Sequence, residues 1–252
     1  MQKIKLTAVS YINTIPFIEA IRNTDFLQKN IDLLVDYPAR CAQYLENNEV
    51  DGGLVPVGAL SKLSSYQIMT NFCIGANGKV DTVVLFAQQK LQNIKIIYLD
   101  YQSRTSVKLL QILAIRYWKQ EFKFLNYTDG IEKNLKNDEA ILLIGDRVFK
   151  YQDAFSYKID LAEEWKKWTN LPFVFAVWVG NKQALSLEKE LNTSFEKYQQ
   201  NISDLYQFNF EITQDVFVDY LENKIDFILD EDKLKSIKLF LQMLEEEKDT
   251  LL

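Results

Sequence analysis

Apolar runs of strand length alternate with amphipathic stretches over the first 180 residues of the chain. Short apolar runs between turn residues are typical of strands, and apolar positions three or four residues apart are typical of helices. The runs that predict strands are KIKLTAVSY (3–11), IDLLVDY (31–37), DGGLVPV (51–57), YQIMTNFCIGANG (66–78), VDTVVLFA (80–87), IKIIYLD (94–100), KFLNY (123–127), AILLIGD (140–146) and LPFVFAVWVG (171–180).

Helical patterns fill the intervals between these runs and the chain after about residue 182. Pro16 and Pro38 stand in the first turn of two predicted helices, and the first of these runs to about Asn23. The other predicted helices are 103–118, 129–139, 184–200, 215–227 and 233–252.

This alternation predicts an α/β fold with a parallel or mostly parallel sheet covered by helices. In such sheets ligands bind beyond the carboxyl ends of the strands, where helices begin. Four polar stretches fall at predicted strand ends: Ser10–Asn13, Asp51–Val57, Ser103–Ser106 and Gly145–Asp146. They are the first candidates for a binding site.

Overall composition narrows the class of partner. The 252 residues are 48% hydrophobic and 25% charged, as in ordinary globular proteins, with a net charge of −6. The negative charge argues against a nucleic-acid or anionic-membrane surface, and no apolar run approaches the roughly 18–20 residues that cross a bilayer. The first residues lack the pattern of a signal peptide, so we expect a cytoplasmic protein.

Histidine is absent, and the two cysteines, Cys41 and Cys73, have no metal-type spacing. Ser–His and Cys–His nucleophile systems and histidine metal sites are therefore excluded, and we expect no bound metal and no disulfide. Any reaction has to use carboxylates, hydroxyls, amides, Lys, Arg, Tyr or the substrate itself.

The helix after IKIIYLD begins with three hydroxyls around one guanidinium, in Ser103, Arg104, Thr105 and Ser106. Ordinary capping of the helix is an equally good explanation of these hydroxyls. Free amides at a helix start and a guanidinium also suit a bound anion. Phosphate loops usually contain glycine and this turn has none, so a carboxylate is the favoured anion.

The other strand ends each have two interpretations. Either Asn13 or Thr14 caps the helix while Tyr11 packs, or Ser10, Asn13 and Thr14 act as neutral donors to a polar ligand. DGGLVPV, which includes Pro56, is either a strand with a glycine bulge or a flat backbone wall beside the ligand. Asp146 either caps the helix that follows it or acts as a base.

Six segments together resemble the chorismate dehydratases of the futalosine pathway of menaquinone biosynthesis, the MqnA family within the MqnA/MqnD superfamily. The segments are VSYINTIPF, VDGGLVPV, IGANGKVDTVVLF, LDYQSRTSVKLLQIL, AILLIGD and WTNLPFVFAVW. They keep the family's order and cover about residues 3–180.

The resemblance implies a periplasmic-binding-protein-like fold of type II. In this fold two α/β lobes are joined by two crossing strands, and the ligand lies in the cleft between them. The crossings map to about Val84–Gln88 and Val174–Val179. Lobe one is then residues 1–86 plus 178–252, and lobe two is residues 87–177.

The resemblance also implies a reaction, the loss of water from chorismate to give 3-[(1-carboxyvinyl)oxy]benzoate without a cofactor. Chorismate is a dianion that loses its C3 hydrogen and its C4 hydroxyl, and aromatisation drives the step. One carboxylate is expected at Ser103–Ser106, and the enolpyruvyl side or the leaving hydroxyl near Ser10, Asn13 and Thr82. The remaining residues expected at the substrate are Thr14, Pro56 and Gly145.

Asn13 and Asp146 are the catalytic candidates that the resemblance indicates. The base is either Asp146 or the enolpyruvyl carboxylate of the substrate, and the lack of histidine slightly favours the substrate. This chain departs from the family pattern at Thr82, where relatives usually have Ser, and at Ala162 and Asn170, where they commonly have Gly.

Two alternatives remain at this stage. A 1,4-dihydroxy-6-naphthoate synthase shares the fold, but that family is associated with a histidine base, which this chain lacks. A non-catalytic binding protein for an aromatic carboxylate is the second. The sequence does not indicate an oligomeric state.

Overall fold

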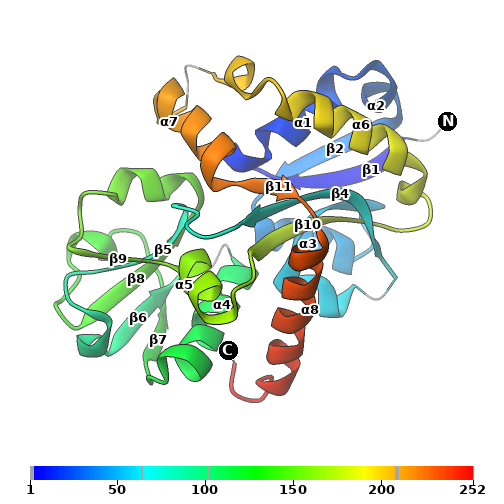
Figure 1. The fold of residues 1–252 in the computed structure, drawn as a ribbon. Coiled ribbons are helices and arrows are strands. Elements are labelled where there is room, and N and C mark those ends of the chain that lie inside the picture. The colour runs from blue at the N-terminus through cyan, green and yellow to red at the C-terminus, as the bar shows by residue number, and fades with distance from the viewer. Residues whose placement is uncertain (1–2, 64, 101–102, 208–209, 252) are drawn as a thin grey trace.

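The computed structural model describes residues 3–63, 65–100, 103–207 and 210–251, which form two α/β lobes (Figure 1). Each lobe is built around one β-sheet with helices packed on it. Tyr101 and Gln102, in the middle of the segment LDYQSRTSVKLLQIL, lie outside the described residues.

The first lobe contains a six-stranded sheet. Its strands are β1 (Ile4–Val9), β2 (Ile31–Asp36), β3 (Gly52–Pro56), β4 (Gln67–Ala76), β10 (Phe173–Gly180) and β11 (Asp226–Ile228). Their order in the sheet is β11-β4-β10-β3-β1-β2. β1 is parallel to β2 and β3, whereas β10 is antiparallel to β3 and β4, and β11 is antiparallel to β4.

The second lobe contains a five-stranded sheet. Its strands are β5 (Val83–Ala87), β6 (Ile96–Leu99), β7 (Lys123–Asn126), β8 (Glu139–Ile144) and β9 (Tyr157–Asp160). Their order is β7-β6-β8-β5-β9, which repeats the arrangement of the first sheet. β6 is parallel to β7 and β8, and β5 is antiparallel to β8 and β9.

Both sheets are mixed, so the expectation of a parallel or mostly parallel sheet is wrong. Apart from the pair of β11 with β4, the antiparallel pairs involve β5 and β10, the strands that follow the two passages of the chain between the lobes. Each of these strands enters its sheet against the direction of the parallel strands. An apolar run that is buried on both faces shows that a strand is covered, but not which way it runs.

The main helices are α1 (Ile15–Asn23), α2 (Asp25–Asn30), α3 (Pro38–Glu46), α4 (Arg104–Ile112), α5 (Leu161–Thr169), α6 (Glu188–Gln199), α7 (Gln214–Asp219) and α8 (Glu231–Glu246). Wide π-type turns continue α4 over Leu113–Trp118 and α7 over Tyr220–Lys224. Pro16 and Pro38 stand in the first turns of α1 and α3, as predicted.

One predicted helix is wrong. Within residues 129–139 only Ile131–Lys133 forms a 3₁₀ turn. Gly130, just before it, has a φ of +96°, and Asn134 and Asn137 follow, residues that favour turns over helix interiors. The short elements β9, α5 and β11 were not anticipated.

The chain passes between the two sheets at residues 77–82, between β4 and β5, and at residues 170–172, between α5 and β10. The crossings expected at Val84–Gln88 and Val174–Val179 therefore fall inside strands that already belong to one sheet. The strand pairing moves the lobe boundaries expected at 86/87 and 177/178 several residues toward the N-terminus. The crossings at 77–82 and 170–172 read NGKVDT and NLP, so they are turn segments next to the strands and not the apolar strands themselves.

The last helix, α8, joins the lobes beside these crossings (Figure 1). It packs against β10 of the first lobe and α4 of the second. Trp165 Nε1 on α5 donates to Ser236 Oγ on α8 at 3.0 Å, and the fully buried Lys233 forms an ion pair with Asp226 on β11. None of the helices in the described parts of the chain is long and apolar enough to span a membrane.

Candidate functional site

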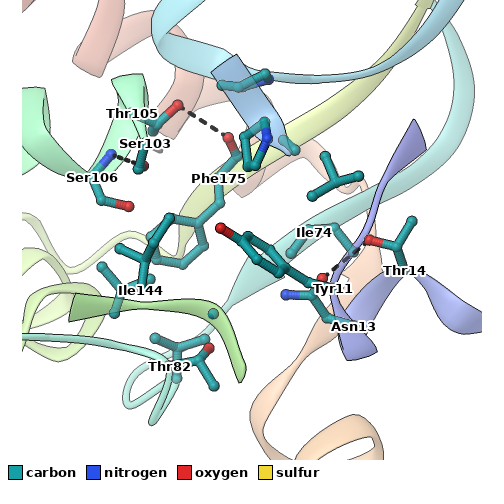
Figure 2. A pocket seen from close by; sticks show the side chains of 17 residues that line it. Tyr11, Asn13, Thr14, Ile74, Thr82, Ser103, Thr105, Ser106, Ile144 and Phe175 are labelled. Atoms are coloured by element: carbon teal, nitrogen blue, oxygen red, sulfur yellow. Dashed lines mark hydrogen bonds between the residues drawn. The ribbon is translucent and has the colours of Figure 1, made fainter. Parts of the chain in front are cut away.

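A narrow cleft with a cavity volume of about 60 Å³ lies between the lobes at the ends of several strands (Figure 2). The lining residues are Val9, Tyr11, Asn13, Thr14, Pro38, Pro56, Ile74, Val80, Thr82, Val83, Ser103, Thr105, Ser106, Ile144, Gly145, Phe175 and Ala176. Of the eleven residues that the sequence places at the substrate or the base, eight line this cleft: Asn13, Thr14, Pro56, Thr82, Ser103, Thr105, Ser106 and Gly145.

The turn after β1 supplies the first-lobe side of the cleft. Ile12–Thr14 form a 3₁₀ turn that leads directly into α1. Thr14 Oγ1 donates to Asn13 Oδ1 at 3.2 Å, and Asn13 Nδ2 donates to the hydroxyl of Tyr220 at 3.1 Å. Neither Asn13 nor Thr14 makes a side-chain capping bond at these helix starts. Here the capping interpretation is wrong, and the side chain of Asn13 is held by Thr14 and Tyr220 instead.

The start of α4 supplies the second-lobe side. Ser103 Oγ accepts from the backbone N–H of Ser106 at 2.9 Å, so Ser103 caps the helix while it also lines the cleft. Thr105 Oγ1 accepts from Gly58 N at 3.0 Å and donates to Phe175 O at 3.2 Å. Thr105 therefore fastens α4 to the first lobe and to β10 (Figure 2).

Arg104 does not line the cleft. Its guanidinium forms an ion pair with Glu46 at the end of α3, in the other lobe. The neighbouring Lys108 donates to Gly58 O at 2.9 Å, which also links α4 to the first lobe. Both cations at the start of α4 thus connect the lobes outside the cleft.

Gly145 and Tyr11 touch across the cleft from different lobes. Gly145 has a φ of +66°, and a Cβ on it would lie 2.8 Å from Tyr11 Cε1. The ring of Tyr11 extends into the cleft from the end of β1, toward Ile144 and Phe175 (Figure 2). Glycine satisfies both the backbone conformation and the close approach.

Asp146 does not line the cleft. It lies in a separate groove with Ser10, Tyr11 and Glu211, and its two carboxylate oxygens accept from Ile12 N at 3.1 and 3.2 Å. Burial raises the pKa of Asp146 to about 6, although the bond from Ile12 opposes this rise. Ser10 belongs to the same groove and is also absent from the cleft lining.

A buried ion pair supports the strand ends beneath the site. Asp100, at the end of β6, pairs with Arg147, which follows β8. The ring of Tyr127 lies under the Arg147 guanidinium at 5.4 Å. Ser103 N lies 3.4 Å from Asp100 O, so the pair joins the segment before α4 to the segment that carries Gly145.

Tyr220 is the residue at the site that sequence reasoning missed. It is 2% exposed, and its hydroxyl bonds with Thr82 Oγ1 at 2.8 Å as well as with Asn13. Burial raises the pKa of Tyr220 above its usual value. It stands in an amphipathic stretch far from any strand end, so its position carried no chemical signal.

The lining of the cleft contains no Asp, Glu, Lys or Arg among the described residues. Its polar groups are hydroxyls, the amide of Asn13 and the N-terminal end of α4, where Ser103 Oγ accepts from Ser106 N. Across the described chain, no group of three or more His, Cys, Asp and Glu side chains could hold a metal ion. The cleft is thus suited to a polar or anionic ligand bound by neutral donors.

The family model described as "Menaquinone biosynthesis" matches residues 4–246 of this sequence. The chain belongs to this menaquinone biosynthesis family. Within it, the curated chorismate dehydratase of Thermus thermophilus is 28% identical over 197 residues, which cover 69% of this chain and 68% of that protein.

Solved structures show that this family member has the periplasmic-binding-protein-like fold. A structural-genomics protein from Archaeoglobus fulgidus superposes with a TM-score of 0.76, 15% identity and 98% of each chain covered. The alkanesulfonate-binding protein SsuA of Xanthomonas axonopodis pv. citri, bound to MOPS, gives a TM-score of 0.68 at 9% identity, over 98% of this chain and 94% of SsuA. A Candida albicans protein described as having the generic periplasmic binding protein fold gives 0.67 at 10% identity, over 97% and 95%.

Proposed function

We propose that this protein is a chorismate dehydratase, a carbon–oxygen lyase that removes water from chorismate to give 3-[(1-carboxyvinyl)oxy]benzoate without a cofactor, in the cytoplasm. Membership of the menaquinone biosynthesis family and the similarity to the Thermus thermophilus enzyme support this proposal. The observation that carries it is the cleft lining, in which neutral donors come from both lobes and no described side chain is an acid or a cation.

The start of α4 is the proposed site of the ring carboxylate. Ser103 and Ser106 line the cleft there, and the helix dipole provides partial positive charge at the N-terminal end of α4. Because Arg104 is paired with Glu46, the proposal assigns this carboxylate to hydroxyls and amides rather than to a guanidinium.

Asn13 and Thr82 are the proposed partners of the enolpyruvyl side and of the departing C4 hydroxyl. Both line the cleft, and both are fixed by Tyr220. A donor aimed at the C4 oxygen stabilises the negative charge that develops as the C4–O bond breaks. Asn13 is a poor base, so its proposed role is to orient the substrate.

The enolpyruvyl carboxylate of chorismate is the proposed base. It takes the proton from C3, the C3–H electrons form the new ring double bond, and the C4 hydroxyl leaves and is protonated to water. A cation beside this carboxylate would lower its pKa and weaken it as a base, and the described lining contains none. Asp146, the other base that the sequence suggested, faces Ile12 N in a separate groove.

Incubation of the purified protein with chorismate tests the proposal. The expected result is loss of one water by mass spectrometry together with the absorbance of a new benzoate. Binding of chorismate without conversion would support a non-catalytic binding protein for an aromatic carboxylate. If the protein neither binds nor converts chorismate, the result would favour the related 1,4-dihydroxy-6-naphthoate synthase activity, which acts on another substrate.

A further inference from the structure

Tyr220 lies behind the cleft and connects two residues that line it from separate segments of the chain. It begins the wide turn Tyr220–Lys224 after α7, and it is not itself among the lining residues. Asn13 Nδ2 donates to its hydroxyl at 3.1 Å, and Thr82 Oγ1 lies 2.8 Å from the same oxygen. Phe149 packs edge-on against the ring, with the centroids 5.3 Å apart.

The hydrogen bonds around Tyr220 have a direction. Thr14 Oγ1 donates to Asn13 Oδ1, which assigns the amide oxygen of Asn13 and leaves its nitrogen to donate to Tyr220. The phenol keeps its single proton, because burial raises its pKa above the ordinary value. A buried hydroxyl proton needs an acceptor, and Thr82 Oγ1 is in place to accept it.

We infer that Tyr220 is a positioning residue that donates to Thr82 Oγ1 and thereby leaves the Thr82 O–H to donate into the cleft. The hydrogen bonds then run in one direction, from Asn13 to Tyr220, from Tyr220 to Thr82 and from Thr82 to the ligand. The inference rests on the proposed function in one respect: the oxygen that receives the Thr82 hydrogen bond is the departing C4 hydroxyl of chorismate. Tyr220 does not touch the substrate, and it acts through Asn13 and Thr82.

The variant Tyr220→Phe keeps the ring and removes the hydroxyl. Its kcat for chorismate is expected to fall about 30-fold or more while KM changes less than about threefold, because the lost interaction matters as the C4–O bond breaks. Tyr127→Phe is the matched control. Tyr127 is also buried and loses a hydroxyl bond, to Glu132, but it does not line the cleft. Its kcat is expected to stay within about twofold of the wild type.

A double-mutant cycle with Thr82→Val separates positioning from a purely structural role. If Tyr220 acts through Thr82, the Y220F/T82V enzyme is expected to be no slower than the slower single variant. Losses in kcat that multiply, or a folded Y220F enzyme with wild-type kcat, would overturn the inference. If Y220F does not fold, the kcat of T82V is compared with that of T82S, which keeps the hydroxyl. Wild-type kcat in T82V would then overturn the inference.

Wild-type protein that leaves chorismate unchanged would refute the proposed function and not this inference. The melting temperatures of the wild type, Y220F, T82V and Y220F/T82V then provide a test that does not depend on turnover. Coupled losses at positions 220 and 82 are expected from a shared hydrogen bond, and additive losses would overturn the inference.

Discussion

The ring of Tyr11 lies against the Cα of Gly145, so a turn of the first lobe and a turn of the second meet at the edge of the cleft. Both residues line the cleft, and Gly145 has a φ of +66°, a backbone conformation that residues with a side chain rarely adopt. This contact is one of several that hold the lobes together around the site.

Gly145→Ala is therefore expected to destabilise the protein more than a positive φ alone explains. A left-handed alanine costs about 1 kcal/mol, and the added Cβ at 2.8 Å from Tyr11 raises the expected loss to about 2–3 kcal/mol. Gly130→Ala is the control, since Gly130 has a φ of +96° and open space around its Cα. Urea unfolding measures both variants, and equal losses would contradict the close contact with Tyr11.

Thr105→Val tests the bond between α4 and the first lobe. The change leaves the Gly58 N–H and the Phe175 carbonyl without their partner, with an expected loss of about 2–4 kcal/mol in the free energy of unfolding. Thr105→Ser keeps the hydroxyl and is expected to lose about 1 kcal/mol or less for its missing methyl. Denaturant unfolding compares the two variants. Equal losses of unfolding free energy would show that the Thr105 hydroxyl does not hold α4 to the first lobe.

Arg104→Gln tests whether the ring carboxylate depends on a guanidinium. Because Arg104 pairs with Glu46, the KM for chorismate is expected to rise less than about threefold, whereas Ser106→Ala is expected to raise it about tenfold. Stability is expected to change by less than about 1 kcal/mol, since both partners of the ion pair are partly exposed. A KM for chorismate that rises about 100-fold in R104Q would show that Arg104 binds the substrate carboxylate.

The raised pKa of Asp146, about 6, predicts a specific pH dependence of stability. The native state holds this proton more tightly than the unfolded chain, whose Asp pKa is about 3.9. The contribution of Asp146 to stability therefore increases as the pH falls from about 7 to 4, by about 2 kcal/mol, and is lost as the pH rises through its native pKa.

Asp146→Asn removes this titration. The free energy of unfolding of D146N minus that of the wild type is expected to be about 2 kcal/mol larger at pH 7.5 than at pH 4.5, because only the wild type gains stability as the pH falls. Urea unfolding at the two pH values measures the difference. A difference that does not change with pH would mean that the Asp146 carboxyl titrates normally.

Much of this fold follows from local pattern. Prolines at the first turns of α1 and α3, and apolar runs at β6 and β8, indicated the right elements. Strand direction was not predictable, because a doubly buried strand is apolar whichever way it runs. Residues 129–139 have helix-forming charges but too few apolar contacts to hold a helix.

The candidate site was predictable where it lies at strand ends. Asn13, Gly145 and the hydroxyls at the start of α4 converge on one cleft because they follow the carboxyl ends of β1, β8 and β6, which face each other from the two lobes. Thr82, just before β5, was indicated only by the family resemblance. Arg104 and Asp146 stand at the same strand ends but turn to partners in the other lobe, a choice that depends on tertiary contacts. Tyr220 reaches the site from a distant helix, and only the folded chain brings it there.

The kcat of D146N for chorismate, measured beside that of the wild type, tests the central claim most directly. The claim is that the uncharged cleft leaves proton abstraction to the enolpyruvyl carboxylate of the substrate. Since Asp146 lies outside the cleft lining, the account predicts that D146N keeps its kcat within about tenfold of the wild type. A loss of about a thousandfold with intact chorismate binding would contradict it and assign the base to Asp146.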